Sequence, residues 1–111
     1  MHYPPPVRFV IVAATPSVLP NDVNVFDKEK NLEINIRNQI AFEIAKKYKL
    51  PYVDHFNLVL QNKKLFKYKD YFHFDSHKEN ILLANMLCQV LILNKVITPN
   101  GDICNDNGQV K

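Results

Sequence analysis

The chain has 111 residues, which suits one small domain. Its residues are 47% hydrophobic and 23% charged, an ordinary globular composition that excludes a disordered chain. The net charge of +3 is too slight to indicate a nucleic-acid-binding protein by itself. No apolar run approaches the ~20 residues that a membrane span needs. Glycine occurs only at positions 101 and 108, which excludes a glycine-rich phosphate loop in the body of the chain.

The first element is an apolar run, Val7–Ala14, which is rich in β-branched residues. A run of this kind predicts a strand buried on both faces, as in a parallel sheet. Residues 15–24, with Pro16 and Pro20, are predicted to form the loop that leaves this strand. Sites in α/β folds gather beyond the carboxyl ends of strands, so this loop lies near any site by position.

A helix is predicted over Asp27–Lys49, because apolar residues recur there at every fourth position. These residues are Leu32, Ile36, Ile40, Ile44 and Tyr48. We expect this stripe to face a core. Pro51 ends the helix, and a second strand is predicted at Tyr52–Asp54. Strand, helix and strand together predict a βαβ unit with parallel strands.

The second half begins with a possible helical turn at Phe56–Leu60 and a basic, aromatic loop at Gln61–Lys69. A terminal helix is predicted over His77–Asn94, and Ser76 with Glu79 has the spacing of a capping box at its start. Residues 98–111 are polar and rich in turn signals, so a flexible tail is expected there.

The two cysteines, Cys88 and Cys104, form no Cys-x-x-Cys motif, which argues against structural zinc. Cys88 lies among apolar residues of the terminal helix, and a buried free thiol is expected there. The N-terminal segment, with three prolines before its apolar run, does not have the pattern of a signal peptide. A reduced, cytoplasmic setting is therefore the expectation.

Asp70 and His73 lie three residues apart, just before the start of the terminal helix. This Asp-x-x-His segment resembles the last conserved block of the SGNH (GDSL-type) hydrolases. Phe74 stands where proline is common in that family, and Ile81–Ala84 falls where the family has an apolar helix.

The resemblance implies an α/β fold for residues 1–97: the C-terminal portion of a three-layer αβα (flavodoxin-like) sandwich with parallel strands. It implies a serine esterase or acyl hydrolase acting on an ester or acetyl group without a cofactor. His73 would be the general base, and Asp70 the acid that orients it. The blocks that carry the family's nucleophile and oxyanion hole are not found. The chain has two serines, of which Ser76 fits a helix cap and Ser17 has no motif around it.

We therefore expect no esterase activity from the chain alone. One flanking strand would leave an apolar sheet edge unpaired, so a second chain that completes the sheet is a possible partner. A fragment of a larger domain is a further expectation.

Two other interpretations stay open. Histidines and aspartates near the Asp-x-x-His segment could form a metal site, with His73 and Asp70 as first ligands. The spacing of these residues argues against such a site. Residues 61–72 combine lysines with aromatic side chains. This loop is the alternative function: a non-catalytic binding module for single-stranded nucleic acid or a protein partner. Nucleic acid is the less favoured of these partners.

Overall fold

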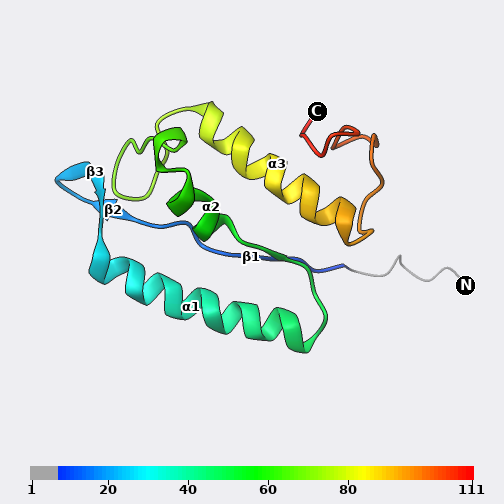
Figure 1. The fold of residues 1–111 in the computed structure, drawn as a ribbon, viewed down its shortest axis with the longest axis horizontal. Helices are drawn as coiled ribbons and strands as arrows, with labels where there is room; N and C mark the ends of the chain where they lie inside the picture. The colour runs from blue at the N-terminus through cyan, green and yellow to red at the C-terminus, as the bar shows by residue number, and fades with distance from the viewer. Residues whose placement is uncertain (1–7) are drawn as a thin grey trace, which may run out of the picture.

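The computed structural model describes residues 8–111 as a mixed helix and strand domain with a parallel two-stranded sheet and three α-helices (Figure 1). Strand β1 (Ile11–Val12) pairs with β4 (Tyr52–Val53), as the βαβ pattern predicted. The N–H groups of Ile11 and Ala13 extend the ladder by donating to the carbonyls of Pro51 and Val53 at 3.0 and 2.9 Å. Strand β1 is shorter than the expected run, whose first residue, Val7, lies outside the described residues.

Helix α1 (Lys28–Lys47) connects the two parallel strands. Asp27 caps its start, where the side chain accepts a hydrogen bond from the Lys30 N–H at 3.1 Å. The helix is found where it was predicted, but the expectation about its buried face is wrong. The apolar stripe is 45% to 66% exposed, and the buried positions are Asn38 and Ala45. The helix contacts β1 through the face opposite the stripe.

A short antiparallel hairpin occupies the segment that was expected to be a loop. It consists of β2 (Val18–Leu19) and β3 (Asp22–Phe26), with Pro20 and Asn21 at the turn. Its first strand brings Val18 into the hydrophobic core, where it is buried together with Val59, Phe66 and Tyr68. The hairpin therefore contributes to the core of the chain's second half.

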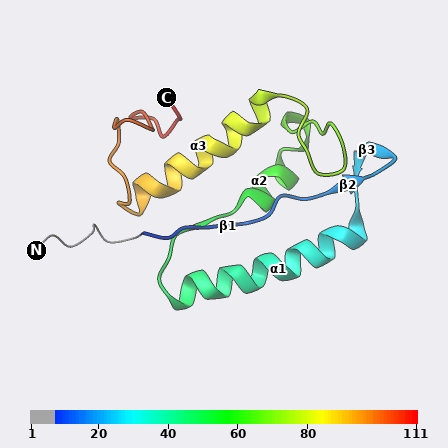
Figure 2. The ribbon, with the colours of Figure 1, turned by 180° about the vertical axis from the view of Figure 1, so that it is seen from behind.

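Helix α2 (His55–Gln61) follows β4 directly and is capped by Asp54, and a 3-10 turn (Lys63–Leu65) comes next. Helix α3 (His77–Leu93) begins at Ser76 with both hydrogen bonds of a capping box, so the predicted helix start is confirmed. Helix α1 contacts β1 and helix α3 contacts β4, and the two views place the helices on either side of the strand pair (Figures 1 and 2). The finer flavodoxin-like arrangement stays a prediction.

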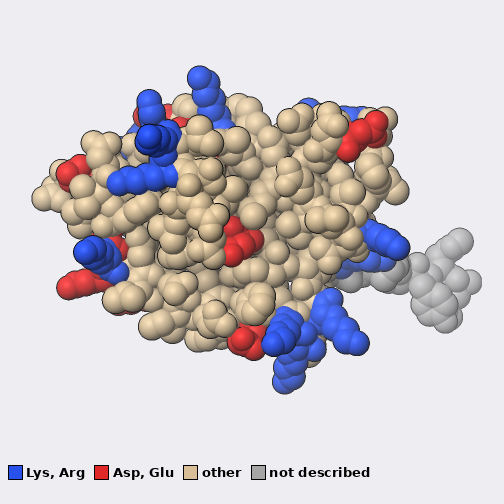
Figure 3. All heavy atoms as spheres, in the orientation of Figure 1, with Lys and Arg blue, Asp and Glu red and all other residues tan. Residues whose placement is uncertain are grey.

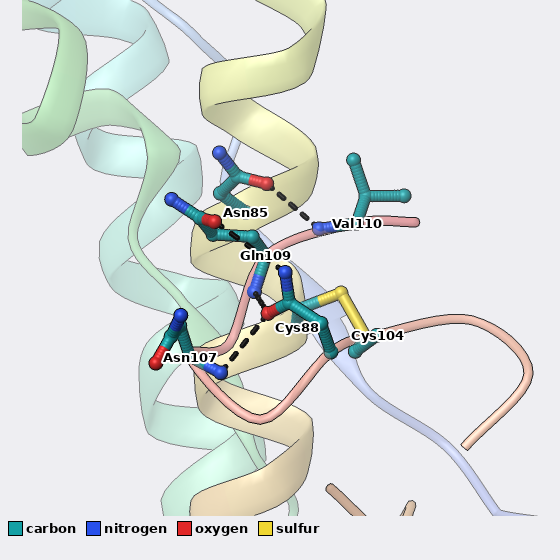
Figure 4. The surroundings of a disulfide bond; sticks show 7 residues. Asn85, Cys88, Cys104, Asn107, Gln109 and Val110 are labelled. Atoms are coloured by element: carbon teal, nitrogen blue, oxygen red, sulfur yellow. Dashed lines mark hydrogen bonds between the residues drawn. A yellow bond between two sulfur atoms is a disulfide. The ribbon is translucent and has the colours of Figure 1, made fainter. Parts of the chain in front are cut away.

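Residues after α3 fold back along that helix, where a flexible tail was expected (Figure 4). Cys104 forms a disulfide with Cys88 of α3, so the expectation of a free thiol is wrong. The Val110 N–H donates to the Asn85 side chain of α3 at 2.8 Å. Gly108 has a φ of +70°, and a Cβ there would lie 2.7 Å from the Gln89 side chain, so glycine suits this close approach.

Among the helices of residues 8–111, none combines the length and the apolar character that a membrane span requires. Disulfides are characteristic of oxidising compartments. The expected cytoplasmic setting therefore stays a prediction that the disulfide does not support.

Candidate active site

The Asp-x-x-His segment forms a narrow loop that is closed by backbone hydrogen bonds. Tyr68 and Phe74 form an antiparallel bridge at its base. The Lys69 N–H donates to the His73 carbonyl, and the Asp75 N–H donates to the Lys67 carbonyl, both at 2.8 Å. The loop therefore has a defined shape before any side chain is considered.

The capping box of α3 also holds this loop. Glu79 accepts hydrogen bonds from the Ser76 hydroxyl at 2.6 Å and from the Ser76 N–H at 3.1 Å. Its other carboxylate oxygen accepts from the Lys67 N–H at 3.2 Å, which ties α3 to the segment that enters the loop. The Ser76 hydroxyl is the first cause of a lowered pKa at Glu79. A buried carboxylate at this position is thus paired on both oxygens.

Asp70 and His73 are brought together by the loop. The His73 Nδ1 lies 2.8 Å from Asp70 Oδ2 and 3.1 Å from Oδ1. Asp70 Oδ1 also accepts the backbone N–H groups of Phe72 and His73 at 3.0 and 2.8 Å. One carboxylate therefore fixes both the turn of the loop and the imidazole that the loop carries.

The electrostatics of the pair follow from these hydrogen bonds. The backbone N–H of Phe72 and then the His73 side chain lower the pKa of Asp70 to about 2. Hydrogen bonds to the charged form of a carboxyl stabilise that form. Asp70 is therefore ionised across the neutral pH range, as a residue that orients a histidine base needs to be.

Both side chains are open to solvent, with 59% of His73 and 40% of Asp70 exposed. Among the described residues, the His73 Nε2 takes part in no hydrogen bond. The Phe72 ring packs against the imidazole with centroids 3.8 Å apart, and Tyr71 packs against Phe72 at 4.4 Å. The imidazole is thus held on one nitrogen and along one face, and the other nitrogen is available to a proton donor.

Neither serine is presented to His73 as a nucleophile. The Ser17 hydroxyl is nearly buried and donates to the Tyr71 carbonyl at 2.7 Å. This hydrogen bond holds the candidate loop through its backbone. The Val18 N–H donates to the same carbonyl at 3.0 Å and has the same effect. Ser76 caps α3.

The structure gives little support to a metal site. Within residues 8–111, no group of three or more His, Cys, Asp or Glu side chains could hold a metal ion. His55 lies nearly buried at the start of α2, with its Nε2 2.9 Å from the Leu83 carbonyl. Burial lowers its pKa, which favours the neutral imidazole. His55 is thus part of the packing between α2 and α3.

The basic, aromatic loop is divided between core and surface. Phe66 and Tyr68 are buried in the core, and the Tyr68 hydroxyl donates a hydrogen bond to the Pro16 carbonyl. Only Tyr71 and Phe72 keep about half of their surface exposed. Two of the four aromatic residues that could stack on bases are therefore committed to the fold. The binding-module interpretation stays a prediction.

The sequence reasoning did not predict how three residues support this loop. Ser17 holds the loop through the Tyr71 carbonyl, Glu79 holds it through Lys67, and Tyr68 anchors it to Pro16. The capping-box spacing located Glu79 but gave no sign of its second contact. Ser17 carries no local signal, because its partner is 54 residues away in the sequence.

Comparison of the chain with protein-family models, with curated proteins and with solved structures gave no match. The resemblance to SGNH hydrolases therefore rests on the Asp-x-x-His segment and on the elements around it.

Proposed function

We propose that Asp70 and His73 are the acid and base of an SGNH-type hydrolase site that cleaves an ester or acetyl group. His73 takes the proton of an attacking hydroxyl at Nε2, and Asp70 orients the ring and stabilises the imidazolium. The nucleophile and the oxyanion-hole donors belong to the N-terminal half of such a domain, which a longer chain or a second polypeptide supplies. In this arrangement the β1–β4 pair belongs to a larger, three-layer flavodoxin-like sandwich.

One observation carries this proposal. The Asp70 carboxylate holds the His73 Nδ1 at 2.8 Å, while Nε2 is free within the described residues. An ionised carboxylate beside Nδ1 favours the tautomer with the proton on Nδ1. The lone pair of the neutral ring then lies on Nε2, which is the arrangement that a general base needs.

The tautomer is directly measurable. We expect the ¹⁵N chemical shifts of neutral His73 to show a protonated Nδ1 and an unprotonated Nε2. Asp70→Asn should weaken that preference, because it removes the charge beside Nδ1. His77, in the first turn of α3, is the matched control and should not respond to the Asp70 substitution. A neutral His73 with its proton on Nε2 would contradict the proposal, since that ring cannot accept a proton there.

Activity measurements test the missing nucleophile. The chain alone should neither turn over a short-chain p-nitrophenyl ester nor react with a serine-directed phosphonate. Turnover lost in His73→Ala, together with covalent labelling of Ser17 by the phosphonate, would show that Ser17 is a nucleophile and that the site is complete. Turnover unaffected by His73→Ala would instead place any chemistry elsewhere in the chain.

A further inference from the structure

The apolar stripe of α1 lies on the surface and has no partner among the described residues. Its members lie four positions apart on one ridge of the helix. The ridge consists of Leu32, Ile36, Ile40, Ile44 and Tyr48, the last being the C-cap residue. It spans about 24 Å at 1.5 Å per residue. The helix already uses its opposite face against the chain, so the ridge is not needed for the fold.

The charges on α1 frame this ridge. Charged side chains gather near the two ends of the helix and leave the stretch between them mostly uncharged (Figure 3). Glu33 lies beside the first residues of the ridge, and Lys47 lies beside the last. Glu33 forms an ion pair with Lys30 of the same helix at 3.6 Å, and both side chains are exposed, so this pair contributes little. An apolar strip with Glu33 near one end and Lys47 near the other complements a copy of itself that runs in the opposite direction.

We propose that this ridge is a dimer interface, with a second copy of the chain as its occupant. The two α1 helices pack antiparallel about a two-fold axis at Ile40. The numbers of any two residues that face each other across the interface therefore add up to 80. Ile36 then faces Ile44 of the other copy, and Leu32 faces Tyr48. At both ends of the contact, Glu33 faces Lys47, and each pair carries opposite charges.

The charges also select this register. A shift of one helical turn in one direction places Glu33 opposite Glu43, and a shift in the other places Arg37 opposite Lys47. A parallel arrangement places every charge beside its own copy. Like charges disfavour all three alternatives, which is how interfaces set register and orientation. Ridges formed by residues four apart pack at a crossing angle of about −50°.

The first measurement is sedimentation equilibrium of the wild-type chain over a range of concentrations. A single helix pair forms a small interface, so we expect a reversible dimer with a dissociation constant on the order of ten micromolar or weaker. Ile40→Lys should abolish the dimer, since the axis brings the two introduced lysines together. Leu93→Lys is the control, because Leu93 is 80% exposed on α3 and lies outside the ridge. It should leave dimerisation unchanged.

A charge exchange tests the register. Glu33→Lys should weaken the dimer about tenfold, because two attractive pairs become repulsive. The double variant Glu33→Lys with Lys47→Glu should restore it, since the pairs are attractive again with reversed signs. Far-UV circular dichroism checks that each variant keeps its helices.

Three results would overturn the proposal. One is a wild-type chain that stays monomeric, which would assign the ridge to another partner or to the chain's own residues. Another is a double charge variant that is as weak as Glu33→Lys, which would exclude this register. The third is an equal loss of dimer in Leu93→Lys and Ile40→Lys, which would show general apolar association in place of a defined interface.

Discussion

The side-chain amide of Asn31 makes two hydrogen bonds with the backbone of Ser17: its Oδ1 accepts the N–H at 2.7 Å, and its Nδ2 donates to the carbonyl at 3.0 Å. Asn38, two turns later on α1, makes the same pair of bonds with Ala14, at 2.9 and 3.0 Å. A carboxamide presents the same donor and acceptor as a peptide group. Helix α1 therefore pairs with the segment after β1 as a neighbouring strand would.

Replacing Asn31 tests the contribution of this pairing. Asn31→Ala removes the partner of the buried Ser17 N–H, and leaving such a group unpaired costs about 2 kcal/mol. We expect that loss in the free energy of unfolding, measured with urea. Asn35→Ala is the control on the same helix, because Asn35 is exposed and its side chain makes no hydrogen bond within residues 8–111. Asn35→Ala should be neutral or slightly stabilising, because alanine has a higher helix propensity than asparagine. Equal losses in the two variants would show that the loss in Asn31→Ala does not come from its hydrogen bonds to Ser17.

The asparagine pairing explains why the sequence predicted helix α1 but not its orientation. The four-residue spacing from Leu32 to Tyr48 correctly indicated a helix, because the period is a property of the chain alone. The usual inference that the apolar side is buried failed, since Asn31 and Asn38 bind backbone groups of Ser17 and Ala14 and so turn the opposite face toward the chain. Which face is buried depended on long-range hydrogen bonds, and single-sequence periodicity carries no information about these.

The candidate site was predictable to a similar degree. Asp70 and His73 lie three residues apart in the sequence, so a local loop could bring them together. The capping-box spacing predicted the helix that follows. The Cys88–Cys104 disulfide was missed for a different reason. The position of Cys88 among apolar helix residues suits both a free thiol and a disulfide, and the return of residues 98–111 along α3 decides between them.

Acid should destabilise the candidate loop through Asp70. Hydrogen bonds in the folded state, first from the Phe72 N–H, lower the pKa of this carboxyl to about 2. The folded protein thus binds the proton more weakly than the unfolded chain does. The stabilisation is fully present above the ordinary aspartate pKa of about 4 and is lost as the pH falls through about 2.

Urea unfolding at a series of pH values measures this effect. Asp70→Asn should flatten the decline in stability between about pH 4 and pH 2, since no proton is then taken up at this position. Asp102→Asn, in the segment after α3, should keep the wild-type profile. A decline equally steep in Asp70→Asn and wild type would assign the acid sensitivity to other carboxyl groups.

The disulfide should hold the C-terminal segment against α3. It links residues 16 apart, and a loop of that size is expected to contribute about 3 kcal/mol to stability. We expect the double variant Cys88→Ser with Cys104→Ser to lose about that amount. Residues 98–111 should then become a site of rapid proteolysis, because only hydrogen bonds such as that from Val110 to Asn85 remain. Unchanged proteolysis would show that those bonds suffice to hold the segment.

The ends of the two long helices offer a stabilising substitution. Lys49 and Lys95, each just after its helix, have φ values of 55° and 57°. Each adopts the left-handed conformation at a helix end where the next N–H returns to the last turn, from Leu50 to Ala45 and from Val96 to Leu91. This conformation costs conformational free energy for a residue with a Cβ, and glycine does not have that cost.

Lys49→Gly and Lys95→Gly should therefore each stabilise the fold, by about 0.5–1 kcal/mol. The two gains should add, because the sites lie on different helices. Lys47→Gly is the matched control: it removes the same side chain two residues earlier, inside α1, and should destabilise by about 1 kcal/mol. Thermal and urea unfolding of the three variants give the comparison. Destabilisation by Lys49→Gly as large as that by Lys47→Gly would show that the lysine side chain, and not its backbone conformation, determines stability at the end of α1.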